Sequence, residues 1–241
     1  GLHVHVGVQS GEKAIAITNG MTRYIPLLIG LSANSPFFDS ELTGLASTRT
    51  KIFEGLPTAG VPPLLKNYSE FQKFMRTLKR ADTIHSIQEV WWDIRPHPGF
   101  GTVEIRVCDA VPSIEEMVNL TALIQCLVVG FSEYYDEGEQ LPILDSWIIN
   151  ENKWRAIKSG VESNLIDFGK QAEAPFEDLF NEMMEFIDDV VDTLGSRKQI
   201  DYLQNMVKNG TSADRQIKIY NKNKDKNEIV DSLISETLEG C

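Results

Sequence analysis

The chain has 241 residues, with 23 Lys and Arg against 35 Asp and Glu, so its formal net charge is −12. The hydrophobic share of 42% and the charged share of 24% are those of an ordinary globular protein, which excludes a disordered, collagen-like or disulfide-rich chain. The acidic balance argues against nucleic acid or an anionic membrane as a partner, because phosphate contacts need a surplus of Lys and Arg.

The sequence also bears on location. The nearest candidate for a membrane helix, residues 120–131, is shorter than the roughly 18–20 apolar residues required, and no secretory signal opens the chain. The cysteines Cys108, Cys126 and Cys241 have no metal-type spacing and cannot all be bridged, so we expect a reducing, cytoplasmic location. The chain opens in mid-strand without a methionine, so we interpret it as lacking an N-terminal segment.

The first elements follow from hydrophobic periodicity. Residues 2–8 alternate between apolar and polar side chains and predict a strand. A helix is expected over about 12–31, kinked or split at Pro26, and a turn follows at 34–36. Residues 43–58 are expected to form a loop and a short strand.

The middle of the chain predicts an amphipathic helix over about 69–80 and two strands, 89–95 and 101–108, separated by a turn at 96–99. A capping box at Ser113-Ile114-Glu115-Glu116 then opens a long, apolar helix that is expected to reach about Tyr134.

The C-terminal third is predicted to be almost wholly helical. One helix ends at Gly195, a second covers 196–209, and the polar stretch 221–228 is expected to be a loop before a last short helix. Together these elements predict an α+β fold, with an antiparallel sheet packed against helices, in a single domain over residues 1–241.

Two predicted strands each present a pair of polar residues on one face. His3 and His5 lie two apart, as do Glu104 and Arg106, so the members of each pair are about 6.5–7 Å apart along the strand. If the strands are neighbours, imidazole, carboxylate and guanidinium groups converge. Imidazole with carboxylate suits a divalent cation, and Arg suits a charged phosphoryl oxygen.

Plainer interpretations stay open for these pairs. The His-x-His pair is equally consistent with the wet side of an amphipathic strand, and Glu104 with Arg106 is typical of an exposed or cross-strand ion pair. A zinc site would need more ligands at close range, and His85 and His97 are the only other histidines.

Other polar residues have equally simple interpretations. Asp93 and Arg95 share a predicted strand face and indicate a structural ion pair covered by tryptophans. Arg49 and Lys51 are either exposed loop cations or contacts for a phosphate or carboxylate. The segment around Arg215 favours a helix N-cap. The sequence has no P-loop, Gly-x-Gly-x-x-Gly or nucleophile elbow.

Several unusual blocks occur in order along nearly the whole chain: GLHVHVG (1–7), LSANSPF (31–37), TGLAS (43–47), LPTAG (56–60), WWDIRP (91–96), GTVEIRVCD (101–109), NKWRA (152–156) and ADRQ (213–216). With these blocks the chain resembles bacterial carboxylate-amine ligases of the glutamate–cysteine ligase type 2 family.

The resemblance implies a glutamine-synthetase-like catalytic sheet and an ATP-dependent ligase that uses Mg²⁺ or Mn²⁺. A carboxylate would attack the γ-phosphate of ATP to give an acyl phosphate, and an amine would displace phosphate to form an amide. The default substrates are glutamate and cysteine, giving γ-glutamylcysteine for glutathione biosynthesis. A cytoplasmic homodimer is the implied state.

The resemblance also implies roles for individual residues. His3 and Glu104 match metal-ligand positions, and Glu104 and Arg106 are the catalytic candidates. His5, Arg106 and Arg49 are expected to contact the nucleotide phosphates. The expected substrate contacts are Asn34, Arg95, Arg155 and Arg215.

The chain departs from the family at its front, where related enzymes carry about a hundred further residues (a length implied by the family), including acidic metal ligands. One His and one Glu are an incomplete cage, so this piece alone is expected to be inactive. Two other hypotheses stay open: a guanidino-type phosphotransferase, which would lean more on Arg, and a non-catalytic binding or dimerisation module.

Overall fold

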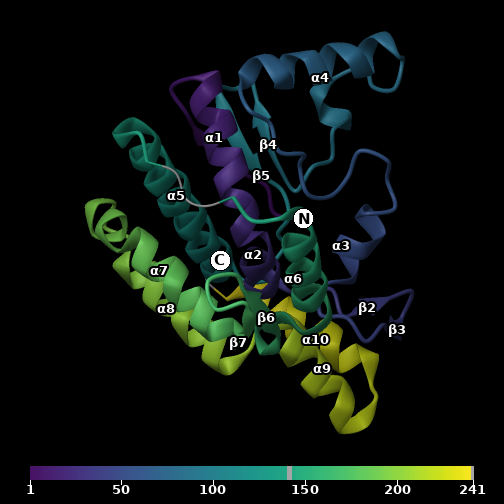
Figure 1. The fold of residues 1–241 in the computed structure, drawn as a ribbon. Coiled ribbons are helices and arrows are strands. Elements are labelled where there is room, and N and C mark those ends of the chain that lie inside the picture. Colours follow the sequence, from purple (N-terminus) through teal and green to yellow (C-terminus); the bar gives the residue numbers. More distant parts are fainter. Residues whose placement is uncertain (140–142, 240–241) are drawn as a thin grey trace.

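The computed structural model describes residues 1–139 and 143–239 (Figure 1). Its fold is α+β, as predicted, with helices dominating. The longer helices are α1 (Gly11–Met21), α2 (Ile25–Ser32), α4 (Tyr68–Arg80), α5 (Ile114–Glu137), α6 (Ser146–Ser159), α7 (Phe176–Thr193), α8 (Arg197–Asn209), α9 (Ser212–Asn223) and α10 (Lys226–Leu238). A short helix, α3, covers Thr48–Phe53, and single 3₁₀ turns cover Thr22–Tyr24, Ile87–Glu89 and Gly160–Glu162.

The strands are short and antiparallel. β1 (Val4–Gly7), β5 (Thr102–Ile105) and β4 (Ile94–His97) form a sheet in the order β1-β5-β4, so the His-x-His strand is the neighbour of the Glu104 strand. Two hairpins pair β2 (Phe37–Phe38) with β3 (Glu41–Leu42) and β6 (Asn164–Asp167) with β7 (Ala172–Pro175).

The register of the three-stranded sheet gives it one apolar and one polar face. Val4 lies opposite Ile105, and Ile94 also lies opposite Ile105, so these side chains share the apolar face. His5 and Arg95 both lie opposite Glu104 and share the polar face. Because side chains alternate along a strand, the polar residues gather without disturbing the core.

The two outer edges of this sheet differ. The Val8 amide donates to the Gly101 carbonyl at 2.9 Å, so the main-chain groups of His3, His5 and Gly7 point away from β5. On the other side, the Arg106 amide donates to the Asp93 carbonyl at 2.8 Å. The nitrogen of Pro96 therefore faces outward, which explains why a proline fits in β4.

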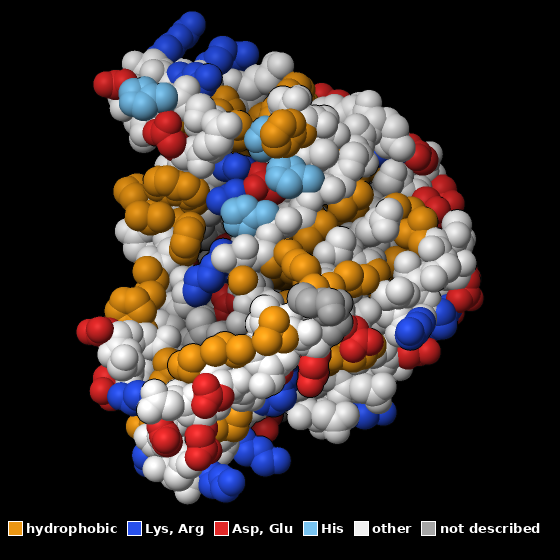
Figure 2. Space-filling model, turned by 180° about the vertical axis from the view of Figure 1, so that it is seen from behind, with side chains coloured by type: hydrophobic (Ala, Val, Ile, Leu, Met, Phe, Trp, Pro, Cys, Tyr) orange, Lys and Arg blue, Asp and Glu red, His pale blue; other side chains and the backbone are white. Residues whose placement is uncertain are grey.

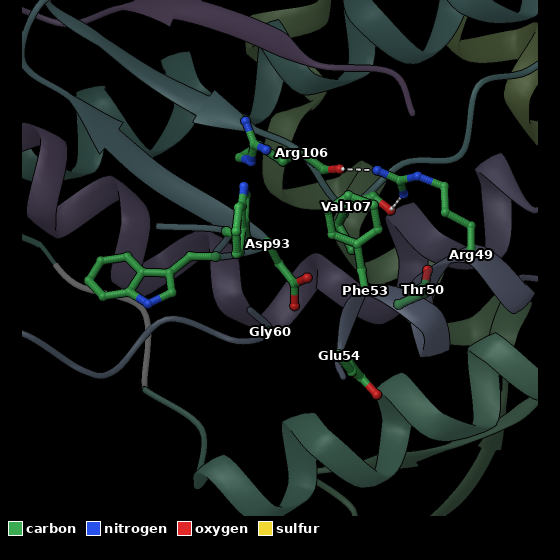
Figure 3. A pocket seen from close by; sticks show the side chains of 10 residues that line it. Arg49, Thr50, Phe53, Glu54, Gly60, Asp93, Arg106 and Val107 are labelled. Atoms are coloured by element: carbon green, nitrogen blue, oxygen red, sulfur yellow. Dashed lines mark hydrogen bonds between the residues drawn. The ribbon is translucent and has the colours of Figure 1, made fainter. Parts of the chain in front are cut away.

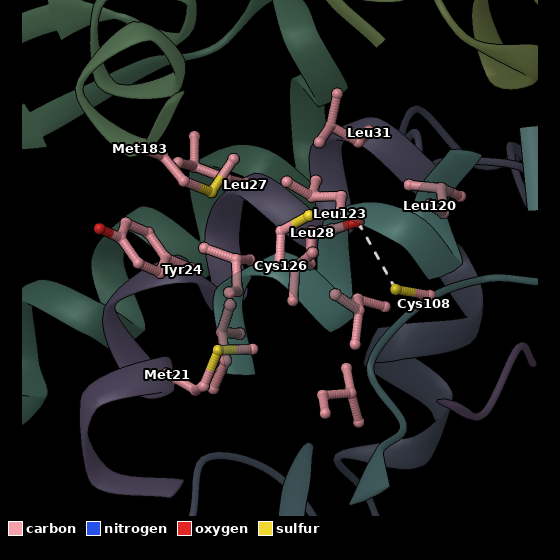
Figure 4. Packing of buried hydrophobic residues seen from close by; sticks show 14 of the residues in the cluster. Met21, Tyr24, Leu27, Leu28, Leu31, Cys108, Leu120, Leu123, Cys126 and Met183 are labelled. Carbon is pink, nitrogen blue, oxygen red and sulfur yellow. Dashed lines mark hydrogen bonds between the residues drawn. The ribbon is translucent and has the colours of Figure 1, made fainter. Parts of the chain in front are cut away.

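The apolar face of the sheet packs on the main core. α1 and α2 run through the middle of the molecule, with α5 on one side and α6 close to α2 (Figure 1). All eight residues of α2 are buried. Figure 4 shows how side chains from α1, α2 and α5 interlock, with Leu28 beside Leu123 and Cys126. α4 covers a smaller cluster around Phe71 and Trp92.

The two cysteines within the described residues, Cys108 and Cys126, are both buried. Burial raises the pKa of the Cys108 thiol to about 12. Cys241 lies outside the described residues.

Two helical stretches, Gly11–Ser32 and Ile114–Glu137, are long and apolar enough to span a membrane, which corrects the expectation that no stretch comes near this length. In their most apolar windows 78% and 56% of the residues are buried inside the protein. Helices in a protein core pass the same test, so the finding is weak evidence for a membrane span.

Three predictions in the first half of the chain were wrong in detail. The turn expected over 96–99 begins later, because Pro96 and His97 belong to β4. The strand expected over 89–95 begins only at Ile94, because Val90 and Trp92 pack into the cluster under α4 and Ile87–Glu89 forms a 3₁₀ turn. The short strand expected within 43–58 is the helix α3. Its first turn is held by tertiary contacts, as the Ser47 hydroxyl donates to Asp109 Oδ1 at 3.1 Å.

Two further differences lie in the C-terminal third. The hairpin β6–β7 interrupts the predicted helices, and the Asn152 side chain on α6 fixes it by bonding both the amide and the carbonyl of Ile166. The loop expected over 221–228 is mostly helix. α9 ends at Asn223, Lys224 takes a left-handed conformation, and α10 begins at Lys226.

Candidate functional site

Glu104 is the centre of the polar face of the sheet. Its side chain is only 3% exposed, and Arg95 Nε donates to Glu104 Oε2 at 2.7 Å. Arg106 Nη1 donates to the other oxygen, Oε1. The two arginines come from different segments, since Arg95 faces Glu104 from β4 and Arg106 directly follows the end of β5. One buried carboxylate therefore holds two guanidinium groups in place.

His5 of β1, and His3 just before that strand, approach the same oxygen from the other side. His3 Nδ1 lies 3.5 Å and His5 Nε2 3.6 Å from Glu104 Oε1. His5 also shares a 2.9 Å hydrogen bond with the Thr102 hydroxyl. Figure 2 shows histidine side chains gathered beside basic and acidic side chains on one hollowed face of the molecule.

The surroundings of each group in this cluster determine its protonation state. Burial alone would raise the pKa of Glu104, but the hydrogen bond from Arg95 and the charges of both arginines outweigh it and hold that pKa below its usual value. Burial, aided by the Arg106 charge, lowers the pKa of His3 to about 4, and burial also lowers the pKa of His5. At neutral pH the site therefore presents an ionised carboxylate, two cationic arginines and a neutral imidazole at His3.

Neutral imidazoles and a carboxylate are the right donor types for a divalent cation, but their arrangement does not complete a site. Both oxygens of Glu104 already accept from arginines. Within residues 1–139 and 143–239 no group of three or more His, Cys, Asp or Glu side chains is placed to hold a metal. By themselves His3, His5 and Glu104 thus fit neither Mg²⁺ nor Zn²⁺.

Arg49 reaches the end of β5 from α3 rather than from a loop. Its guanidinium donates to the carbonyls of Val107 at 3.3 Å and Arg106 at 3.2 Å, as Figure 3 shows. Asp109 Oδ1 lies 3.5 Å from Arg49 Nη1. The side chain is thus fixed against the strand that carries Glu104 and Arg106.

Arg49 and Arg106 line one side of a small cavity next to the sheet, and Asp93 and Glu54 line another (Figure 3). The cavity volume is about 20 Å³, room for about one water molecule, so a nucleotide or amino acid would enter only after side chains move. The remaining walls are Thr50, Phe53, Gly60, Trp91, Trp92 and Val107.

A residue that the sequence did not single out pairs with two of the residues that line this cavity. Lys153 on α6 has a side chain 2% exposed, and its Nζ lies 2.5 Å from Asp93 Oδ2 and 2.9 Å from Glu54 Oε1. The predicted Asp93–Arg95 ion pair is therefore wrong, because Asp93 pairs with Lys153 and Arg95 with Glu104. The available signal was a lysine flanked four residues away by Ile149 and Ile157, at a core position of a helix.

The other predicted substrate residues lie outside the cluster around Glu104. Asn34 follows α2, and its side chain bonds the Ala110 carbonyl, the Ser212 hydroxyl and the Gln216 amide. Arg155 pairs with Glu151 and Glu173 beside the β6–β7 hairpin.

Arg215 lies on α9, where it pairs with Glu116 and Glu236. The sheet brings together His3, His5, Arg95, Glu104 and Arg106, with Arg49 at its end, and leaves Asn34, Arg155 and Arg215 in structural contacts elsewhere.

Comparison with known proteins gives a consistent result. The family model described as "Glutamate-cysteine ligase family 2(GCS2)" matches residues 1–236. Relatives named "Putative glutamate--cysteine ligase 2" are 43% identical in Chloroflexus aurantiacus and 44% in Chloroflexus aggregans, over 241 residues. These matches cover 100% of this chain and 62% of each relative, so the chain spans about three fifths of their length.

A solved structure has a similar fold. It is a glutamate–cysteine ligase from Francisella tularensis in complex with AMP, with a TM-score of 0.67, covering 96% of this chain and 59% of that one. At 14% identity the likeness concerns the fold alone.

Proposed function

The chain belongs to glutamate–cysteine ligase family 2, and from this premise we propose that it carries the phosphate-facing part of an ATP-dependent ligase that joins a carboxylate to an amine. The observation that carries the proposal is the fixed pair Arg95 and Arg106 on Glu104, beside the imidazoles of His3 and His5. ATP as the nucleotide is supported by the AMP in the Francisella tularensis complex.

The proposed reaction has two steps. A carboxylate oxygen attacks the γ-phosphorus of ATP, and the bond between that phosphorus and the β–γ bridging oxygen breaks. The products of this step are ADP and an acyl phosphate. The amine nitrogen then attacks the acyl carbon, phosphate departs, and the nitrogen's proton passes to phosphate or solvent. Glutamate and cysteine are the proposed substrates, on the strength of the relatives' names, and γ-glutamylcysteine is the proposed product.

Within this scheme Arg106 has the central role. Its guanidinium is permanently charged, and Glu104 holds it at the surface of the sheet, where it can face charge that develops on a transferring phosphoryl group. Arg95 lies behind Glu104 and fixes the carboxylate, so its proposed role is to position Arg106 rather than to touch a substrate. His5 would donate a hydrogen bond to a phosphate oxygen.

The metal remains a separate proposal. A divalent cation would neutralise charge on the phosphates, with His3 and Glu104 among its ligands, but the described residues supply too few of them. We propose that the remaining ligands belong to the part of the relatives' length that this chain does not span. The homodimer and the cytoplasmic location are likewise proposals that rest on the family resemblance.

The test is phosphate release from ATP by the longest natural form of the protein, with Mg²⁺ or Mn²⁺, glutamate and a panel of amines including cysteine. Arg106→Gln should lower kcat by about 10²–10³-fold, the effect of removing one preorganised group that stabilises transition-state charge. His85→Gln is the control, because the His85 side chain is 82% exposed and lies near Asp82.

Product analysis separates the alternatives. ADP, phosphate and an amide in equal amounts support the ligase, whereas a phosphorylated guanidine would indicate a phosphotransferase. No turnover with any amine and no ATP binding would favour a non-catalytic module. Turnover that ignores Arg106→Gln would overturn the role assigned to that residue.

A further inference from the structure

Lys153 is a buried cation that the proposed reaction does not use. Its side chain is 2% exposed, yet it carries an ammonium group between two carboxylates from different parts of the chain. Burial opposes its charged form, but Asp93 and Glu54 outweigh burial and raise the pKa of Lys153. A lysine in this position is therefore charged at neutral pH.

Each of the two carboxylates that pair with Lys153 is connected to an arginine that lines the cavity. The Asp93 carbonyl accepts the hydrogen bond from the Arg106 amide, so Asp93 and Arg106 are neighbours across the sheet. Glu54 ends α3, the same short helix that carries Arg49. Lys153 therefore ties α6 to both segments that present arginines to the cavity.

The charges around the cavity show why this matters. Asp93 and Glu54 line the same cavity as Arg49 and Arg106. Glu54 also pairs with Lys51, so without Lys153 it is above all the buried Asp93 carboxylate that would be free to repel an anionic ligand or to draw the arginines away from it. Lys153 on both carboxylates and Lys51 on Glu54 together compensate the two negative charges, and the arginine side of the cavity keeps its positive potential.

We propose that Lys153 is a positioning residue, which holds Asp93 and Glu54 away from Arg49 and Arg106 and so keeps the two arginines available for the nucleotide's phosphates. The inference rests on the proposed function, because it takes ATP as the anion. Stability alone gives no reason for the arrangement, since replacing a buried ion pair by apolar side chains is often neutral or stabilising.

The test compares two buried lysines. Lys153→Met removes the ammonium and keeps the bulk of the side chain. Lys13→Met is the matched control, because Lys13 is 6% exposed and pairs with Asp136 at 2.7 Å on α5, without contact to either arginine. ATP affinity is measured by calorimetry, KM and kcat by phosphate release, and Tm by thermal unfolding, all on the longest natural form of the protein.

Lys153→Met should weaken ATP binding and raise KM for ATP by at least about tenfold, since an uncompensated charge acts on phosphate at close range. The effect on kcat should be smaller. Lys13→Met should lower Tm by less, because Asp136 is 62% exposed, and should leave ATP affinity unchanged. Lys153→Arg, which keeps the charge, should retain most of the affinity. If Lys153→Met does not fold, the double variant Lys153→Met/Asp93→Asn, which removes one charge of each sign, takes its place.

Equal ATP affinities for Lys153→Met and Lys13→Met would overturn the inference and leave Lys153 a structural residue. If the wild type binds ATP but turns over no amine, the proposed ligase activity is wrong. The role of Lys153 is then still tested by comparing the ATP affinities of the two variants. If the wild type does not bind ATP at all, both fail together.

Discussion

A single carboxylate, Glu104, organises the polar face of the sheet. Removing one partner of a buried charge pair is more costly than never having built the pair, because the remaining charge stays buried without compensation. Arg95, itself 3% exposed, depends on Glu104 in this way. Substitutions at Glu104 will therefore change stability as well as chemistry, which is why Arg106, with a side chain 12% exposed, is the better probe of activity.

For a single residue, the lowered pKa of His3 predicts that the stability of the protein depends on pH. Its pKa is about 4 in the folded protein against an ordinary value of 6.5, so between these pH values the unfolded chain binds more protons. Stability must therefore fall as pH drops from 6.5 towards 4. His3→Gln should lose less Tm over this range than the wild type.

The measurement is Tm at several pH values from 7 to 4 with EDTA present. His85→Gln is the control, since the His85 side chain is 82% exposed. The interpretation fails if the wild type and His3→Gln lose Tm in parallel.

At the scale of elements, the sequence predicts best where periodicity is local. The alternation of residues 2–8 and 101–108 predicted that His3 shares a face with His5, and Glu104 with Arg106, because period-2 alternation is a property of each strand alone. The pairing of the two strands, on which the convergence of all four depends, is given by the structure. Local periodicity could not predict α3, whose start is held by Asp109 about sixty residues away, nor the hairpin held by Asn152. Lys153 was missed for the same reason, since its carboxylates come from distant segments.

Packing between elements makes Gly30 on α2 a sensitive position. A Cβ there would lie 2.4 Å from the ring of Phe176 and 3.3 Å from the Gly160 carbonyl, and Phe176 is only 1% exposed. Overpacking typically costs 1–3 kcal/mol, and the better helix propensity of Ala returns up to about 1 kcal/mol. Gly30→Ala should thus destabilise the protein by about 1–2 kcal/mol.

Urea unfolding checks this value, with Gly7→Ala for comparison. A Cβ at Gly7 would meet nothing within 4 Å, so that variant should change the free energy of unfolding by less than about 0.5 kcal/mol. Similar losses in the two variants would show that α2 can move to accept the methyl group.

At the scale of the whole molecule, Arg215 joins the C-terminal helices to α5. It pairs at 2.8 Å with Glu116, whose side chain is 3% exposed, and at 2.7 Å with Glu236 on α10. Burial raises the pKa of Glu116, although the charge of Arg215 acts to lower it. Without the arginine, the buried Glu116 carboxylate would lose the partner that offsets its desolvation cost. Arg215→Met should lower the free energy of unfolding by about 1–3 kcal/mol.

The matched control is Arg197→Met. Arg197 also pairs with two carboxylates, Asp188 and Asp192, but both are more than 60% exposed, so its loss should have a much smaller effect. Denaturant unfolding compares the two variants, and ATP affinity provides a second measurement. A loss of ATP affinity without a loss of stability in Arg215→Met would instead support the substrate-binding role that the sequence suggested.

The two edges of the three-stranded sheet differ in their ability to pair with a further strand. Pro96 offers no amide on the outer side of β4, whereas the amides and carbonyls of His3, His5 and Gly7 face outward along β1. An added strand, from whatever source, would be accepted beside β1 and refused beside β4. Such a strand would lie next to the imidazoles near Glu104. Adding a strand to the sheet would therefore also add residues to the polar site.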